Sequence, residues 1–369
     1  MEFINKYLRN LKPYKLASHK IWAVEPKDRE GILKLDWNEA TVPPSPKVTA
    51  RVKELLDGPG FFNLYPTTKN DRLLEAIAGF VKLPIESIQY FGSSDVLHEY
   101  ICRSFLCGGD KVLMLGPSYD NFRLTCQSGG AEVSFFYYND DFTFDAAGFE
   151  TTLASLKPVM TYICNPNNPT GNYHTPEYIR HLLETFPQTL FLIDEAYGEF
   201  AGESSKDLVL KYDNIIVTRT LSKAFAMANF RIGYLLASEA NIAAIGKIRN
   251  PKNITTISQE AAVAALEDAD YMWSYVDQVH KGQAYFIEAS AQFADHYTVY
   301  PSRGNFNLLK FNTREEKMAL LGYLADHDIF VRDTTQAPSV EKCFRVTMGT
   351  KKQMERVIGV IGDFYKNQK

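Results

Sequence analysis

Short apolar runs alternate with amphipathic stretches through most of the chain. Apolar side chains are almost continuous within each run, and the stretches between them, such as residues 176–186, carry apolar side chains at helical spacing. Apolar strands that alternate with helices predict an α/β fold, in which a mainly parallel sheet is covered by helices on both faces. The predicted strands are residues 88–91, 111–115, 133–138, 159–164, 190–194 and 215–220.

The pattern changes near residue 250. A long helical region is predicted first, followed by separate strands and helices, which together indicate a smaller α+β domain. The predicted helices are residues 258–294, 314–326 and 351–366, and the predicted strands are residues 305–311 and 343–347. The predicted organisation is an N-terminal arm (1–34), a large domain (35–250) and a small C-terminal domain (251–369).

Composition excludes several classes of protein. The 369 residues are 45% hydrophobic and 23% charged, as in ordinary globular proteins, and the net charge of −4 disfavours a nucleic-acid surface. No apolar run approaches the roughly 20 residues that span a bilayer, and the N-terminus lacks a signal-peptide pattern. The five scattered cysteines form no Cys-x-x-Cys pair, so they predict reduced thiols in a cytoplasmic protein and no metal site.

Candidate chemistry begins with Lys223, which follows the apolar run 215–217 after a short polar link. Most lysines lie on a solvated surface. A lysine at the end of a buried strand can instead lose its charge and become a nucleophile, as a Schiff base with an aldehyde cofactor requires. Ser222 precedes it, and Arg231 follows eight positions later.

Three further groups of polar residues fall at predicted strand ends. Asp194 closes the run 190–193, and a buried aspartate needs a partner or caps a turn. Residues 165–171 read Asn-Pro-Asn-Asn-Pro-Thr-Gly, a proline-rich turn. Residues 92–95, Gly-Ser-Ser-Asp, lie where a helix begins, so Ser94 or Asp95 could cap it and its N–H groups could bind phosphate. Because ligands collect at the carboxyl ends of parallel strands, these groups could converge there.

Together, Asn165–Gly171, the run Asp194-Glu195-Ala196-Tyr197 and the spacing Ser222-Lys223-x(7)-Arg231 resemble fold-type I aminotransferases that use pyridoxal phosphate. The histidinol-phosphate aminotransferase-like group is the most similar. The resemblance implies a large cofactor-binding domain and a small domain. It also implies that Lys223 forms the Schiff base and transfers the substrate proton, and that Asp194 pairs with the cofactor's ring nitrogen.

The resemblance assigns the remaining cofactor contacts. Asn168 and Tyr197 match the donors to the phenolic oxygen, and Tyr119 matches the aromatic residue that stacks on the ring. Tyr65 matches a tyrosine that reaches the cofactor phosphate of a neighbouring subunit, which implies a homodimer with shared active sites. The phosphate contacts are the backbones of Ser94 and Asp95 and the side chains of Ser222 and Arg231.

Arg345 matches an arginine that binds a substrate carboxylate or phosphate, and Asn305 and Arg332 fall where the family carries pocket residues. Three departures from the family pattern stand out. The usual Asn-Glu-Asn-Pro-Tyr-Gly is Asn-Glu-Ala-Thr-Val-Pro at residues 38–43, and the usual Gly-Ser-Asp-Glu is Ser-Ser-Asp-Val at residues 93–96. Asn229 replaces a glycine, and because asparagine tolerates a left-handed backbone, the turn is predicted to survive.

The resulting prediction is an aminotransferase that uses glutamate and a small phosphorylated substrate, of the histidinol-phosphate or the dihydroxyacetone phosphate/serinol phosphate type. No nucleic-acid or membrane partner is expected. The alternative is a pyridoxal-phosphate-dependent decarboxylase of an O-phosphorylated amino acid. A pyridoxal-phosphate sensor is disfavoured because no basic helix-turn-helix segment precedes the domain. A nicotinamide dehydrogenase and a P-loop NTPase lack their glycine motifs.

Overall fold

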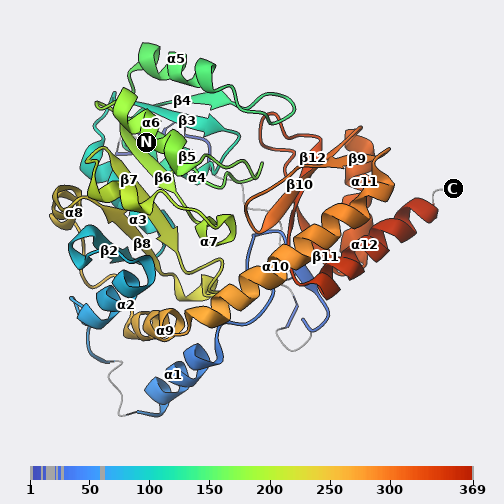
Figure 1. Cartoon of the computed structure of the whole chain (residues 1–369), viewed down its shortest axis with the longest axis horizontal. Helices are drawn as coiled ribbons and strands as arrows, with labels where there is room; N and C mark the ends of the chain where they lie inside the picture. The colour runs from blue at the N-terminus through green and yellow to red at the C-terminus, as the bar shows by residue number, and fades with distance from the viewer. Residues whose placement is uncertain are drawn as a thin grey trace.

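A seven-stranded sheet forms the larger part of the molecule (Figure 1). The computed structural model describes residues 3–9, 11–13, 21, 24–25, 29–58 and 63–367. The strands lie in the order β2 (Ile88–Phe91), β8 (Gly233–Ala237), β7 (Ile215–Thr220), β6 (Leu190–Asp194), β5 (Met160–Cys164), β3 (Lys111–Gly116) and β4 (Glu132–Tyr137). Only β8 runs antiparallel to its neighbours. This confirms the predicted mainly parallel sheet.

Helices flank this sheet (Figure 1). Helix α2 (Asp71–Val81) buries one stripe of apolar side chains, among them Leu73, Ile77 and Val81 at helical spacing. The Asn70 side chain starts α2 by accepting a hydrogen bond from the Leu73 N–H at 3.0 Å. The helices of this part are α1 (Pro46–Asp57), α2 (Asp71–Val81), α3 (Ser94–Phe105), α4 (Asn121–Ser128), α5 (Ala146–Leu156), α6 (Pro176–Thr185), α7 (Gly198–Ala201), α8 (Glu239–Gly246) and α9 (Thr256–Leu266).

A second sheet has five strands. Their order is β1 (Leu33–Leu35), β11 (Ile329–Asp333), β12 (Cys343–Thr347), β10 (Phe306–Phe311) and β9 (Tyr297–Val299). The helices of this part are α10 (Ala269–Ser290), α11 (Arg314–Asp326) and α12 (Lys351–Lys366). Figure 1 shows α10 running from the end of α9 toward this second sheet. Strand β1 pairs in parallel with β11, so a segment from the start of the chain completes a sheet built from its end.

The structure differs from the predicted elements in two ways. The single helix predicted for residues 258–294 is divided into α9 and α10, because the backbone leaves helical geometry at Asp268. The Asp268 carboxylate accepts a hydrogen bond from the Ser45 hydroxyl at 2.5 Å and pairs with Lys47 at 2.8 Å, which ties the break to the start of α1. Strands β1, β8, β9 and β11 were not predicted. The domain boundaries at residues 34 and 250 stay predictions.

Within the described part of the chain, no helix is long and apolar enough to cross a membrane. All five cysteines lie in that part and are free thiols.

Candidate active site

A cavity opens where three neighbouring strands of the large sheet end. Cys164, Asp194 and Thr220 are the last residues of β5, β6 and β7, and all three line it. Parallel strands bring such ends to one edge of the sheet, as the sequence predicts. The complete lining is Ser94, Asp95, Tyr119, Cys164, Asn168, Asp194, Ala196, Tyr197, Thr220, Ser222, Lys223 and Arg231.

Lys223 is partly buried in this cavity. Its Nζ donates a hydrogen bond to the backbone carbonyl of Trp37 at 2.7 Å. Burial and, second to it, the positive charge of Arg345 lower the pKa of Lys223 to about 8. A substantial fraction of the amine is therefore neutral near physiological pH, as a nucleophilic lysine requires.

The buried Asp194 carboxylate is held by hydrogen bonds on both oxygens. Its Oδ1 accepts the Thr218 hydroxyl at 3.1 Å and the Ala196 N–H at 3.2 Å. Its Oδ2 accepts the Tyr162 hydroxyl at 2.7 Å. Buried charges are costly unless they are paired in this way, so the carboxylate is fixed in a set orientation at the base of the cavity.

The Tyr197 hydroxyl oxygen accepts hydrogen bonds from two side-chain amides. Asn168 Nδ2 lies 3.3 Å from the Tyr197 hydroxyl oxygen, and Asn38 Nδ2 lies 3.1 Å from the same atom. Burial raises the pKa of Tyr197, so the phenol keeps its proton and can donate. Asn168 and Tyr197 are thus brought together as predicted, and Asn38 is an additional partner.

The start of α3 also lines the cavity, through Ser94 and Asp95. Ser93 caps this helix and accepts the Val96 N–H at 3.3 Å, whereas the prediction placed the cap at Ser94 or Asp95. Ser94 and Asp95 are instead the first residues of the helix, whose N–H groups have no partner within it. Ser93 reaches this position with a left-handed φ of 109°.

Arg231 and Tyr119 meet at Asp95. Arg231 Nη2 lies 3.4 Å from Asp95 Oδ2, and the Tyr119 hydroxyl donates to Oδ1 at 2.8 Å. Arg231 belongs to the turn that follows Lys223. The left-handed residues of that turn are Ala226 and Arg231, with φ values of 59° and 54°. Asn229 itself does not use the left-handed backbone that asparagine tolerates, because it lies inside the short helix η7 (Ala228–Phe230).

The predicted substrate residues come from the five-stranded sheet. Arg345 on β12 donates from Nη1 to the side-chain oxygen of Asn168 and from Nη2 to the Asp36 carbonyl, the latter at 2.6 Å. Arg332 lies opposite Arg345 on β11. Asn305 is buried and donates to the Asn38 carbonyl at 3.1 Å. Arg345 therefore contacts a residue of the cavity, whereas Arg332 and Asn305 lie outside its lining.

Tyr65 lies away from the cavity. Its side chain is 81% exposed, and Lys252 Nζ lies 4.4 Å from the centre of its ring. The cavity of one chain therefore includes every predicted cofactor residue except Tyr65.

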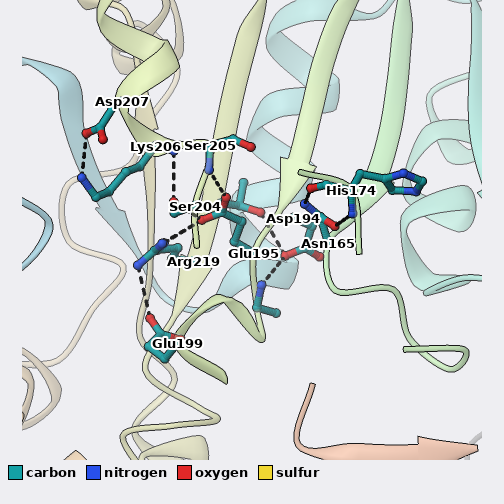
Figure 2. A network of polar contacts seen from close by, with 12 residues as sticks. Asn165, His174, Asp194, Glu195, Glu199, Ser204, Ser205, Lys206, Asp207 and Arg219 are labelled. Atoms are coloured by element: carbon teal, nitrogen blue, oxygen red, sulfur yellow. Dashed lines mark hydrogen bonds and ion pairs between the residues drawn. The ribbon is translucent and has the colours of Figure 1, made fainter. Parts of the chain in front are cut away.

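Next to Asp194, Glu195 points to a different set of partners (Figure 2). Glu195 pairs with Arg219 at 2.8 Å, and Arg219 lies 3.5 Å from Glu199; all three side chains are buried. Glu195 also accepts the Ser205 N–H at 2.7 Å. This network fixes the turn after β6 and so supports the positions of Asp194 and Tyr197.

Sequence reasoning missed four contributors to this region: Trp37, Asn38, Tyr162 and Thr218. Trp37 contributes only a backbone carbonyl, which no side-chain pattern signals. Tyr162 and Thr218 are polar side chains next to the apolar residues of β5 and β7, and this was the available signal. Asn38 belongs to the Asn-Glu pair of the N-terminal segment, and its positive φ of 55° marks it as a special position.

Comparison with known proteins identifies relatives over the full length of the chain. The profile of the family described as aminotransferase class I and II matches residues 30–361. A dihydroxyacetone phosphate transaminase of Campylobacter jejuni is 40% identical over 99% of this chain and 98% of its own. A histidinol-phosphate aminotransferase of Ruminiclostridium cellulolyticum is 32% identical over 87% of this chain and 89% of its own.

Solved structures share the fold. The histidinol-phosphate aminotransferase of Sinorhizobium meliloti, in complex with pyridoxal-5'-phosphate, has a TM-score of 0.86 and 24% identity, covering 100% of this chain and 99% of its own. The L-threonine-O-3-phosphate decarboxylase of Porphyromonas gingivalis has a TM-score of 0.78 and 22% identity, covering 91% and 100%.

Proposed function

Because the chain belongs to the aminotransferase class I and II family, we propose that the cavity around Lys223 transfers an amino group between glutamate and a small phosphorylated substrate. The chain is an aminotransferase, and its cofactor is pyridoxal phosphate. The residue roles and the identity of the substrates are the proposed part.

The chemistry of the lining carries this proposal. Nine of the ten residues predicted to contact the cofactor line one cavity. Its guanidinium, hydroxyl groups and helix start suit the phosphate dianion. A buried carboxylate, Asp194, suits a protonated ring nitrogen, and the Lys223 amine lies in the same cavity. The residues present therefore fit pyridoxal phosphate.

When bound, the cofactor supplies an electron-accepting ring. The chain supplies the rest. Lys223 provides the amine and moves the proton at the substrate Cα. Asp194 pairs with the ring nitrogen and keeps the proton on it. Tyr197 and Asn168 donate hydrogen bonds to the phenolic oxygen of the cofactor and orient the ring. Tyr119 packs against it, and Ser94, Asp95, Ser222 and Arg231 hold the phosphate.

The proposed substrates follow from the relatives and from Arg345. The Campylobacter jejuni relative is named for dihydroxyacetone phosphate, and the other named relative for histidinol phosphate. Arg345 presents a guanidinium beside Asn168, where a carboxylate or phosphate of the substrate could pair with it. Arg332 and Asn305 support this edge of the pocket. Of these two candidates we propose dihydroxyacetone phosphate as the amino acceptor, because the segment 38–43 departs from the pattern of the histidinol-phosphate enzymes.

A homodimer with shared active sites is part of the proposal. Tyr65 is exposed and lies outside the cavity of its own chain, so it is available to the cofactor phosphate of a second copy. A cytoplasmic location stays a prediction of the cysteine pattern.

Two half-reactions test the proposal. Glutamate added to the holoenzyme should remove the visible absorbance band of the cofactor, and dihydroxyacetone phosphate should restore it. The Lys223→Ala variant is the control and should show no turnover. A wild-type spectrum that no amino donor changes would refute the proposal.

The decarboxylase alternative is tested in the same preparation. Phosphoserine and phosphothreonine are each incubated with the holoenzyme while carbon dioxide and keto products are measured. Carbon dioxide released without a keto product would favour decarboxylation over transamination.

A further inference from the structure

His98 is a buried histidine on α3, the helix whose start lines the cavity. It lies on the inner face of α3 and is 1% exposed. Neither ring nitrogen has a hydrogen-bond partner within the described part of the chain. A neutral imidazole carries one N–H and one acceptor nitrogen, and a buried polar group without a partner costs free energy. Such a residue requires an explanation beyond packing.

The polar group facing this ring is Asp194. His98 Nε2 lies 3.7 Å from Asp194 Oδ2, the same oxygen that accepts the Tyr162 hydroxyl at 2.7 Å. This separation exceeds the usual upper limit of an N–H···O hydrogen-bond distance by about half an ångström. Hydrogen bonds at catalytic sites are often long before the ligand binds and shorten once it is in place.

Aromatic packing holds the His98 ring in this direction. Phe122 stacks on Tyr162 with centroids 4.3 Å apart and planes at 14°. The His98 ring stands edge-on against both, at 83° to Phe122 and 88° to Tyr162. Rotation of the imidazole away from Asp194 would disrupt both contacts. Burial raises the pKa of Tyr162, so its hydroxyl keeps the proton that it donates to Asp194.

We propose that His98 is a positioning residue that acts through Asp194, donating its Nε2–H to the carboxylate and limiting how strongly Asp194 draws the proton from the cofactor's ring nitrogen. This inference rests on the proposed role of Asp194. Two donors on Oδ2 weaken the hold of the carboxylate on the proton, which therefore stays on the ring. With Tyr162 alone, Asp194 takes a larger share of the proton, and the ring becomes a weaker electron acceptor.

Two substitutions separate positioning from packing. The Gln side chain in His98→Gln can place an amide N–H close to the position of Nε2, whereas His98→Leu is apolar and of suitable size for the helix face. The main readout is the pH midpoint of the visible absorbance of the bound cofactor. We expect His98→Leu to move it upward by about half a unit or more and to lower kcat about tenfold, with smaller changes in KM. We expect His98→Gln to stay close to wild type.

The buried His174 provides a control, because its ring hydrogen-bonds to the Tyr138 hydroxyl at 3.1 Å. His174→Leu should lower thermal stability without moving the spectral midpoint. If His98→Leu and His98→Gln give the same midpoint, or both match wild type, His98 only fills space and the proposal is overturned. A wild-type protein without a cofactor band would instead refute the proposed function.

Neutron diffraction from deuterated wild-type holoenzyme provides a second measurement that needs no variant. The expected result is a deuteron on His98 Nε2 directed at Asp194 Oδ2. A deuteron on Nδ1 alone would overturn the proposal.

Discussion

Lys223 shows how one residue's surroundings prepare it for chemistry. Burial and the nearby Arg345 lower the pKa of Lys223 from 10.5 to about 8, so the neutral amine predominates above that pH. The rate at which pyridoxal phosphate attaches to the cofactor-free protein should therefore rise with pH and level off above about 8. Stopped-flow absorbance across pH 6–10 measures this.

A substitution of Arg345 is the control for this pH dependence. Because that charge lowers the pKa of Lys223, the variant Arg345→Met should move the midpoint of the attachment rate to higher pH. A wild-type midpoint near the 10.5 of an ordinary lysine would contradict the prediction.

Ser93 carries backbone strain where the family pattern has glycine. Its φ of 109° and ψ of 163° lie in a region that is almost restricted to glycine, at a strain of about 1–3 kcal/mol for other residues. Replacing a serine cap by glycine costs only about a few tenths of a kcal/mol. Ser93→Gly should therefore stabilise the protein by about 1 kcal/mol in urea unfolding.

Ser45→Gly is the comparison for this prediction. Ser45 caps α1 with an ordinary φ of −45° and accepts the Lys47 N–H. Without strain to relieve, this variant should lose stability. If both variants lose stability equally, the strain at Ser93 has no energetic consequence.

At the scale of elements, a buried ion pair joins β6 to β7. Arg219 on β7 pairs with Glu195, directly after β6, and with Glu199 in α7. Arg219→Met would leave two buried carboxylates close together, and burial already raises the pKa of Glu199. We expect a loss of about 3–5 kcal/mol in the free energy of unfolding, measured in urea with saturating cofactor.

Lys206→Met is the matched surface change, since Lys206 pairs with the exposed Asp207 at 2.6 Å. Its loss should be about 1 kcal/mol or less. Equal losses in the two variants would show that the buried network adds no stability.

The elements themselves were predictable to different degrees. Strands β5, β6 and β7 are fully or almost fully buried, so their apolar runs stand out in the sequence. Strand β8 is equally buried but runs antiparallel, immediately after the Arg231 turn, and was missed. Strands β1 and β9 have three residues each, too few for a periodic pattern, and only their partners define them.

At the scale of the whole molecule, the proposed dimer makes a sharp prediction. If Tyr65 of each chain serves the other chain's site, a heterodimer of Tyr65→Ala and Lys223→Ala chains contains one intact site. Tandem-affinity purification of co-expressed, differently tagged chains isolates this species. It should have about half of the wild-type activity, whereas both homodimeric variants should be strongly impaired. A heterodimer no more active than its parents would contradict shared active sites.

The sequence by itself determined the mainly parallel sheet, the family and the cluster of polar residues at the strand ends. Those features depend on local patterns: an apolar run, a turn and a polar residue where the strand stops. Only the tertiary structure decided the contacts between distant segments. Lys223 meets the carbonyl of Trp37 across 186 positions, and Arg345 meets Asn168 across 177. His98 faces Asp194 because α3 packs against the sheet, an approach that the sequence alone does not reveal.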